Sequence, residues 1–225
     1  MNSKTTSVVT LLFDWDGTLV DSAQLGLTAF ERSFTALGMP FDYEVYREVY
    51  SPNWYSVYEA MGIPKDKWQT ADKLWIQHYG EQTAQPVQGA RETVIGLRQK
   101  GFRLGVVSSG SGCRVAREIS ELGFGSLFEV VICNEQMEKK KPDPEGLEIA
   151  MRTLGCLPEE SCYVGDSPED IEMGKRAGML TVGVRSGYPT SWKLESCDPD
   201  IFIASITRLL DHFERTEATP SSGLD

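Results

Sequence analysis

The chain has 225 residues, of which 40% are hydrophobic and 24% charged, a composition ordinary for a globular protein. Its formal net charge of −11 argues against nucleic acid or an anionic membrane as a partner, although a local cation can still bind a small phosphorylated molecule. No segment is long and apolar enough to cross a bilayer, and the five cysteines form no CxxC pair, so we expect a cytoplasmic protein with reduced thiols.

The first predicted element is a buried strand over residues 8–13, which leads into two carboxylates, Asp14 and Asp16. A glycine turn at Gly17 closes this apolar run. Because side chains alternate along a strand, we expect both carboxylates to leave its end on the same side. Such a pair is costly without a cation or a proton beside it, which favours a hard metal ion, a nucleophile or both.

Residues 22–82 carry helical patterns and no strand signal. The first helix is indicated by apolar residues at helical spacing, namely Leu27, Phe30, Phe34 and Leu37. Shorter helices follow near residues 42–50 and 54–61, and a further helix begins at Pro64. This stretch predicts a small helical module.

From residue 86 onward, strands alternate with helices. We predict strands over residues 103–108, 129–133, 161–165, 180–184 and 200–203, and helices over 90–100, 114–122, 144–154 and 170–177. This alternation is typical of an α/β protein with a doubly wound parallel sheet. Residues 216–225 are polar, and we expect them to be disordered.

Three more polar clusters accompany the predicted strands. Ser108 and Ser109 end the strand over 103–108, a run of three lysines stands before Pro142, and Asp166 follows the strand over 161–165 with Asp170 four residues later. With the Asp-Trp-Asp-Gly-Thr segment, these clusters resemble, in the same order, the four motifs of the haloacid dehalogenase (HAD) superfamily. The resemblance extends over nearly the whole chain. It implies a Rossmann-like core and places all four motifs at carboxyl ends of strands, where open α/β sheets bind ligands.

The position of the helical module adds a domain organisation to this resemblance. HAD enzymes with a helical insert after the first strand form the helical-cap branch of the superfamily. The expected domains are therefore a discontinuous core, residues 1–20 and 86–225, and a cap, residues 21–85. Hinges would lie near residues 19–22 and 84–89.

The resemblance also implies catalytic roles. It assigns Asp14 as the nucleophile that forms an aspartyl-phosphate, and Asp16 as the general acid and then the general base. It assigns Ser108 and Lys141 to the phosphoryl group, Lys141 being selected because it directly precedes Pro142, while Lys139 and Lys140 are expected in solvent. The backbone N–H groups of Ser109 and Gly110 are further candidates for phosphate binding.

The same family pattern implies a Mg²⁺ site of oxygen ligands. Its expected ligands are Asp14, Asp16 through its backbone carbonyl, and Asp166. Asp170 is expected to support the site by orienting Lys141 or a metal-bound water.

Substrate contacts are expected from the cap, where Arg47, Asn53 and Trp54 are the candidates. Arg47 would suit a substrate carboxylate by bidentate pairing, and a plain surface arginine is an equal alternative.

The expected function is Mg²⁺-dependent hydrolysis of a small phosphorylated metabolite by a monomer or homodimer, and the chain resembles the phosphoglycolate phosphatase group most. A phosphomutase of the β-phosphoglucomutase type is the first alternative, because it shares the four motifs. A catalytically idle HAD fold used for binding is the second.

Overall fold

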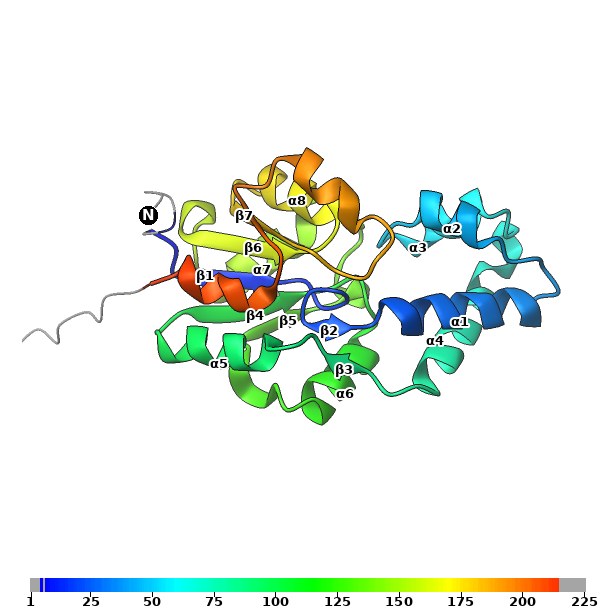
Figure 1. Ribbon diagram of the computed structural model, residues 1–225, viewed down its shortest axis with the longest axis horizontal. Coiled ribbons are helices and arrows are strands. Elements are labelled where there is room, and N and C mark those ends of the chain that lie inside the picture. The colour runs from blue at the N-terminus through cyan, green and yellow to red at the C-terminus, as the bar shows by residue number, and fades with distance from the viewer. Residues whose placement is uncertain (1–4, 6, 215–225) are drawn as a thin grey trace, which may run out of the picture.

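A parallel sheet of six strands forms the centre of the protein in the computed structural model, which describes residue 5 and residues 7–214 (Figure 1). In spatial order the strands are β5 (Val130–Ile132), β4 (Arg103–Val107), β1 (Thr10–Phe13), β6 (Ser161–Gly165), β7 (Leu180–Val184) and β8 (Ile201–Ile203). The α/β class and every strand predicted from the sequence are confirmed. The predicted disorder of residues 216–225 lies outside the described residues.

Strand β1 shows why these short apolar runs form the sheet. All four of its residues are buried, and Leu11 and Phe13 pack into one apolar cluster while Leu12 packs into another. A parallel sheet is covered on both faces, so its central strands need apolar side chains at consecutive positions.

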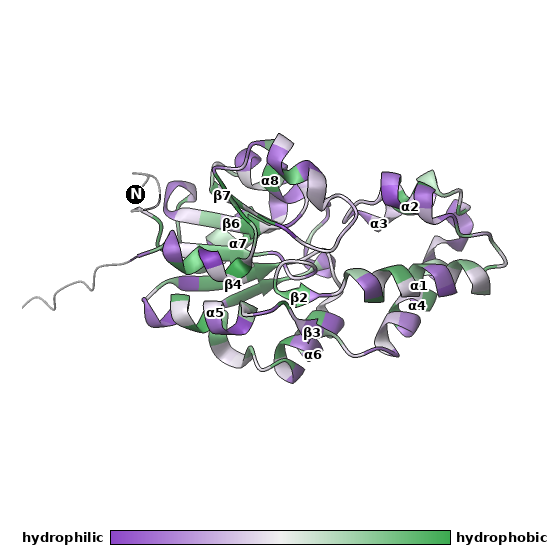
Figure 2. Ribbon diagram, in the orientation of Figure 1, coloured by the Kyte–Doolittle hydropathy of each residue, from purple (hydrophilic) through white to green (hydrophobic). Residues whose placement is uncertain are grey.

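Helices supply the two covering layers. Helices α5 (Ala90–Gln99) and α6 (Gly112–Glu121), with a 3₁₀ helix (Ile206–Asp211), contribute to the cluster that holds Leu11 and Phe13. Helices α7 (Glu145–Leu154) and α8 (Pro168–Arg176) contribute to the cluster that holds Leu12. Figure 2 shows apolar residues gathered on the strands and polar residues on the outer helices.

The helical insert lies beyond the end of the sheet (Figure 1). It consists of α1 (Ala23–Ala36), α2 (Tyr43–Val49), α3 (Trp54–Ala60), a 3₁₀ turn (Lys65–Lys67) and α4 (Trp68–Gly80). These helices share an apolar cluster of their own, built around Phe30, Phe34, Tyr46 and Tyr58. No helix in the described part of the chain has both the length and the apolar character needed to span a membrane.

Two short strands join the insert to the sheet. Strands β2 (Val20–Asp21) and β3 (Gln85–Pro86) pair in antiparallel fashion where the chain leaves the core and where it returns. Two-residue strands leave no periodic pattern in a sequence, which is why they were not predicted. They lie at the proposed boundary between core and cap, and the division into two domains stays a prediction.

Gly105 tests how tightly the sheet is packed. A Cβ atom at this position would lie 2.6 Å from Val130 Cγ1 and 2.8 Å from Leu12 Cδ2, its neighbours on the adjoining strands. We expect Gly105→Ala to lower the free energy of unfolding by about 1–3 kcal/mol, the usual cost of overpacking, in urea titrations followed by circular dichroism. Gly80→Ala is the control, because no atom lies closer than 3.9 Å to its added Cβ. Equal losses in the two variants would contradict the packing argument.

Candidate active site

The predicted motifs meet at the carboxyl edge of the sheet, next to β1. The strand order reverses direction at β1, which lies between β4 and β6. The parallel register places Asp14, Ser108 and Asp166 just beyond the ends of these three adjoining strands. A ligand crevice is expected at such a switch point.

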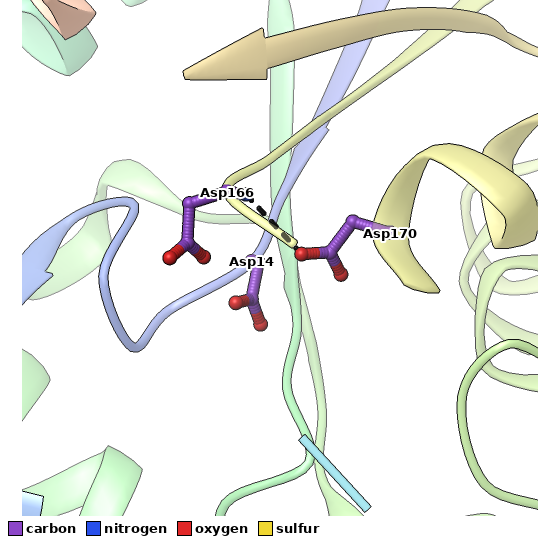
Figure 3. A group of neighbouring side chains, drawn as sticks. All are labelled: Asp14, Asp166 and Asp170. Carbon is purple, nitrogen blue, oxygen red and sulfur yellow. Dashed lines mark hydrogen bonds between the residues drawn. The ribbon is translucent and has the colours of Figure 1, made fainter. Parts of the chain in front are cut away.

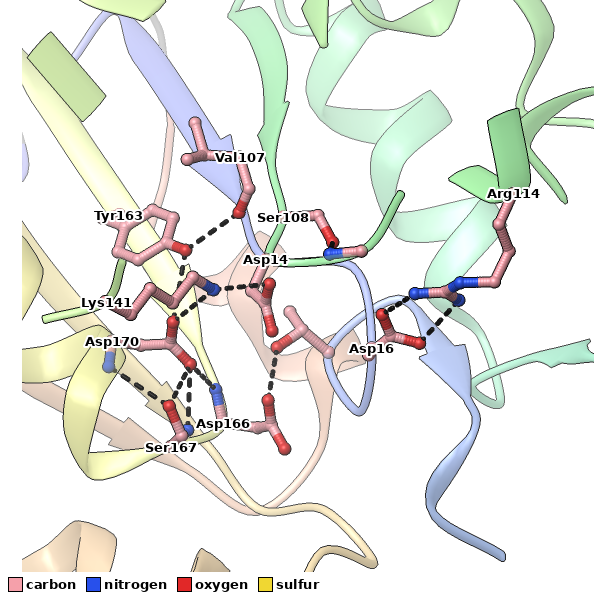
Figure 4. A network of polar contacts seen from close by, with 12 residues as sticks. Asp14, Asp16, Val107, Ser108, Arg114, Lys141, Tyr163, Asp166, Ser167 and Asp170 are labelled. Atoms are coloured by element: carbon pink, nitrogen blue, oxygen red, sulfur yellow. Dashed lines mark hydrogen bonds and ion pairs between the residues drawn. The ribbon is translucent and has the colours of Figure 1, made fainter. Parts of the chain in front are cut away.

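Lys141 is the buried cation of this edge. Its Nζ atom lies 2.6 Å from Asp14 Oδ1 and 2.7 Å from Asp170 Oδ1 (Figure 4). Burial alone would lower the pKa of Lys141, but the charges of the two carboxylates raise it well above its usual range. Lys141 therefore stays protonated, and it holds the predicted nucleophile in a fixed position.

Asp170 is held from several sides. Its Oδ2 atom accepts hydrogen bonds from the backbone N–H groups of Asp166 and Ser167, at 3.2 and 3.0 Å, and from the Ser167 hydroxyl at 2.7 Å. The Tyr163 hydroxyl lies 3.2 Å from Oδ1, which also accepts from Lys141. Both carboxylate oxygens of Asp170 already accept hydrogen bonds. Asp170 is therefore suited to positioning its neighbours and has little remaining capacity to bind a metal or a substrate.

Three carboxylates gather beside this network. Asp14, Asp166 and Asp170 each offer an oxygen within 4.8 Å of the others, and Figure 3 shows them converging from β1, β6 and α8. Because Asp170 is already occupied, Asp14 and Asp166 are the ligands that a cation would use. The Thr18 hydroxyl donates to Asp166 Oδ1 over 3.2 Å and fixes that side chain.

The electrostatics of this cluster favour a bound cation. Burial, opposed by Lys141 and assisted by Asp170, raises the pKa of Asp14 to about 7. Burial and the charges of Asp14 and Asp170 raise the pKa of Asp166 well above its usual range. The single charge of Lys141 cannot balance three ionised carboxylates, and an all-oxygen donor set of this kind fits Mg²⁺.

Asp16 points away from the acidic cluster, toward Arg114 of α6. Arg114 donates to both carboxylate oxygens, with 2.9 Å between Nη1 and Oδ1. Burial alone would raise the pKa of Asp16, but the charge and hydrogen bonds of Arg114 outweigh it and lower the pKa. The two carboxylates that follow β1 thus have different partners, and the Asp16 side chain is not part of the acidic cluster.

Arg114 also contacts the cap, a role that sequence reasoning missed. Its guanidinium lies 4.8 Å from the centre of the Tyr79 ring and 5.9 Å from that of Trp75, both on α4. Nη1 further donates to Glu118, over 3.1 Å to Oε2. Arg114 lies in the first turn of α6, where a cation is electrostatically unfavourable. This placement was the one sequence signal that could have marked Arg114 as a functional residue.

The phosphate-binding candidates Ser108, Ser109 and Gly110 follow β4. Ser108 is buried, and its Oγ accepts the N–H of Gly110 over 2.9 Å. In this structure that N–H holds Ser108 in place, while the Ser108 hydroxyl hydrogen can point to a ligand. Ser109 and Gly110 both line the cavity described below, and phosphate binding by their N–H groups stays a prediction.

The other two lysines of the basic run behave differently from each other. Lys139 is exposed, as expected. The expectation for Lys140 was wrong, because its ammonium donates to the carbonyl oxygens of Asn134 and Met137. Lys140 therefore ties down the loop that carries Lys141.

A cavity of about 210 Å³ extends from the carboxylates into the cap. Its lining includes, from the core, Asp14, Asp16, Ser109, Arg114, Lys141, Asp166 and Tyr188, and from the cap, Phe30, Tyr50, Trp54, Tyr55, Tyr58, Asp72, Trp75 and Ile76. Trp54 thus lies where the sequence placed it, whereas Arg47 and Asn53 are not among the lining residues. The Arg47 side chain is 55% exposed and pairs with Glu44 on α2.

Tyr188 is a second residue that sequence reasoning missed. It follows β7, and its ring stacks on Tyr50 of the cap with 5.0 Å between ring centres. Its hydroxyl lies 3.0 Å from the hydroxyl of Ser22, near the first connection to the cap. No local pattern marks such a tyrosine, because its partners are distant in the chain.

Comparison with known proteins decides the family. Residues 11–184 match the sequence profile of the haloacid dehalogenase-like hydrolases. The chain belongs to this family. The resemblance drawn from the four motifs is confirmed, and so is the expectation of an enzyme.

Individual members of this HAD family are similar over almost their whole length. A protein named pyrophosphatase PpaX, from Halalkalibacterium halodurans, is 30% identical over 217 residues, which cover 90% of this chain and 95% of that protein. A phosphoglycolate phosphatase from Escherichia coli O157:H7 is 29% identical, covering 92% and 93%. The crystal structure of a predicted phosphoglycolate phosphatase from Haemophilus somnus 129pt shares the fold, with a TM-score of 0.79 at 22% identity and coverage of 92% and 98%.

Asp170 gives a direct test of the polar network in this HAD enzyme. Asparagine keeps the shape of the side chain but replaces one carboxylate oxygen by an NH₂ group. That NH₂ group would face hydrogen-bond donors that a carboxylate oxygen accepts in the unmodified protein. Because breaking one partner of a buried ion pair costs about 3–5 kcal/mol, Asp170→Asn should lower the free energy of unfolding by about that much in urea titrations. Asp198→Asn is the control, since that side chain is 98% exposed. A loss no larger than the control's would contradict the network.

Proposed function

We propose that this protein hydrolyses the phosphoric monoester of a small molecule, with Mg²⁺ as its cofactor. The observation that carries this proposal is the setting of Asp14. Its carboxylate is buried beside Lys141, gathers with Asp166 into a cation-sized site, and lines a cavity large enough for a small ester. Phosphoryl transfer needs such positioning and charge neutralisation above all.

In the first step, an Asp14 carboxylate oxygen attacks phosphorus, and the bond from phosphorus to the leaving oxygen breaks. The Ser108 hydroxyl, the Ser109 N–H and the Lys141 ammonium bind the phosphoryl oxygens. Asp16 gives its proton to the leaving oxygen, so that the product is a neutral alcohol. When bound at Asp14 and Asp166, Mg²⁺ would offset the negative charges that this step brings together.

In the second step, a water molecule attacks phosphorus of the aspartyl-phosphate. Asp16 takes a proton from this water, the bond between phosphorus and the Asp14 oxygen breaks, and inorganic phosphate leaves. The pairing with Arg114 holds Asp16 ionised, which is the form that this second step requires. The first step requires Asp16 to be protonated, so the ion pair between Asp16 and Arg114 must weaken before that step.

The two carboxylates that follow β1 can be separated by substitution. Asp14→Asn should abolish turnover of p-nitrophenyl phosphate, because a neutral amide cannot attack phosphorus. Asp16→Asn should lose about 10²–10⁴-fold on an alkyl phosphate, the usual contribution of positioned proton transfer. Phosphate release is the measurement, and Asp66→Asn, an exposed cap position, is the control. Residual activity of Asp14→Asn near that of the unmodified enzyme would contradict the nucleophilic role.

The metal can be tested by removal. Treatment with EDTA should silence phosphate release from p-nitrophenyl phosphate, and added Mg²⁺ should restore it, because Asp14 and Asp166 offer only oxygen ligands. Isothermal titration with Mg²⁺ should show binding that Asp166→Asn weakens. Full activity in EDTA would overturn the assignment of the cofactor.

A further inference from the structure

The cap side of the cavity is aromatic and carries a single charge. Its rings belong to Phe30, Tyr50, Trp54, Tyr55, Tyr58 and Trp75. Among the described residues that line this side, Asp72 is the one with an ionisable carboxylate, and none is a lysine or an arginine. The mechanism above uses none of these residues.

Asp72 is oriented by two tyrosines. The hydroxyl of Tyr55 lies 3.1 Å from its Oδ2, and the hydroxyl of Tyr58 lies 3.2 Å from its Oδ1. A carboxylate can accept about four hydrogen bonds, so each oxygen retains capacity for a ligand. In the described part of the chain Asp72 forms no ion pair. Burial raises the pKa of this carboxyl, so its ionised form would gain from a cation brought beside it.

The surrounding aromatic rings pack against one another. Phe30 lies edge-on to Tyr58 and Trp75, with ring centres 6.1 and 6.0 Å apart. Tyr55 stacks on Trp68, with ring centres 5.1 Å apart. Because these rings are already ordered, binding a ligand costs little conformational entropy. Aromatic faces also attract both cations and alkyl chains.

Helix α4 determines how far Asp72 lies from the catalytic residues of the core. Asp72, Trp75 and Tyr79 follow one another at spacings of three and four residues, so they share a face of α4. At 1.5 Å per residue, Asp72 lies about 10 Å along the helix from Tyr79. Tyr79 lies against Arg114, the partner of Asp16. Asp16 and Arg114 line the cavity at one end of this helix face, and Trp75 and Asp72 line it farther along, so a leaving group would need several carbon atoms to reach Asp72.

An anionic leaving group would be poorly placed here. A carboxylate or second phosphate would face Asp72 with no cap cation to pair with, because Arg47 lies on the outside with Glu44. On the core side, Arg114 is already shared between Asp16 and Glu118. These charges argue against a leaving group that carries an anion on a chain long enough to reach Asp72.

We propose that the substrate is the phosphate ester of an amino alcohol, with an apolar chain against the cap's aromatic rings and a cationic amine beside Asp72. This inference rests on the proposed phosphatase function and names its substrate class.

The test is a matched series of phosphate esters assayed with the whole enzyme and Mg²⁺. It comprises ω-aminoalkyl, n-alkyl and ω-carboxyalkyl phosphates of two to six carbons, with p-nitrophenyl phosphate as the general substrate, and kcat/KM is measured by phosphate release. For the longer chains, the amino ester should exceed the alkyl ester by on the order of ten- to a hundredfold, the effect of one charged hydrogen-bonded pair. The carboxyalkyl esters should be the poorest.

Asp72→Asn assigns the preference to its residue. This change removes the charge and keeps the shape, so the ratio of amino to alkyl ester should fall to near one. Asp66→Asn, an exposed carboxylate of the same cap, should leave that ratio as it is.

Two kinds of failure are distinguishable. Turnover of p-nitrophenyl phosphate with no preference for amines, or with a preference for carboxylates, would overturn the amino alcohol and leave the phosphatase standing. An unchanged ratio in Asp72→Asn would also overturn it. Loss of turnover with every ester would instead overturn the proposed function itself. If Asp72→Asn does not fold, the series with the unmodified enzyme still decides.

Discussion

The site depends on one buried ammonium held between two carboxylates. A charge out of water is costly unless paired, so Lys141 requires both Asp14 and Asp170 within hydrogen-bond reach. Asp14 lies 127 residues from Lys141, and Asp170 lies 29 residues from it. Pairing therefore fixes the end of β1, the lysine loop and the start of α8 relative to one another. The position of Asp14, the proposed nucleophile, follows from this constraint.

A second constraint separates the two carboxylates that follow β1. Burial, assisted by the charge of Asp170, raises the pKa of Asp14 to about 7 despite Lys141, whereas the charge and hydrogen bonds of Arg114 lower the pKa of Asp16. The proposed mechanism uses this difference, with Asp14 attacking phosphorus and Asp16 moving protons. Arg114 also lies against Tyr79 of α4, so one guanidinium contacts both Asp16 and the helical insert.

Core and cap contribute different things to the cavity. The core supplies charged groups that fit any phosphoryl group, whereas the cap supplies aromatic rings and one carboxylate that can contact only the rest of the substrate. The stacking of Tyr188 on Tyr50 joins these two halves at the cavity wall. In the proposed function, chemistry and substrate choice would therefore be carried by separate parts of the chain.

The sequence by itself determined the sheet and the four motifs. A strand buried on both faces needs consecutive apolar residues, and the polar residues that follow it, such as Asp14, are local and readable. Partners across the fold were not readable: Arg114 lies 98 residues from Asp16, and Tyr188 lies 166 residues from Ser22. Which face of a cap helix meets the cavity was also undetermined, so Arg47 was a candidate and Asp72 was not. Only tertiary packing decides such pairings, because a side chain's neighbours depend on how separate elements are placed together.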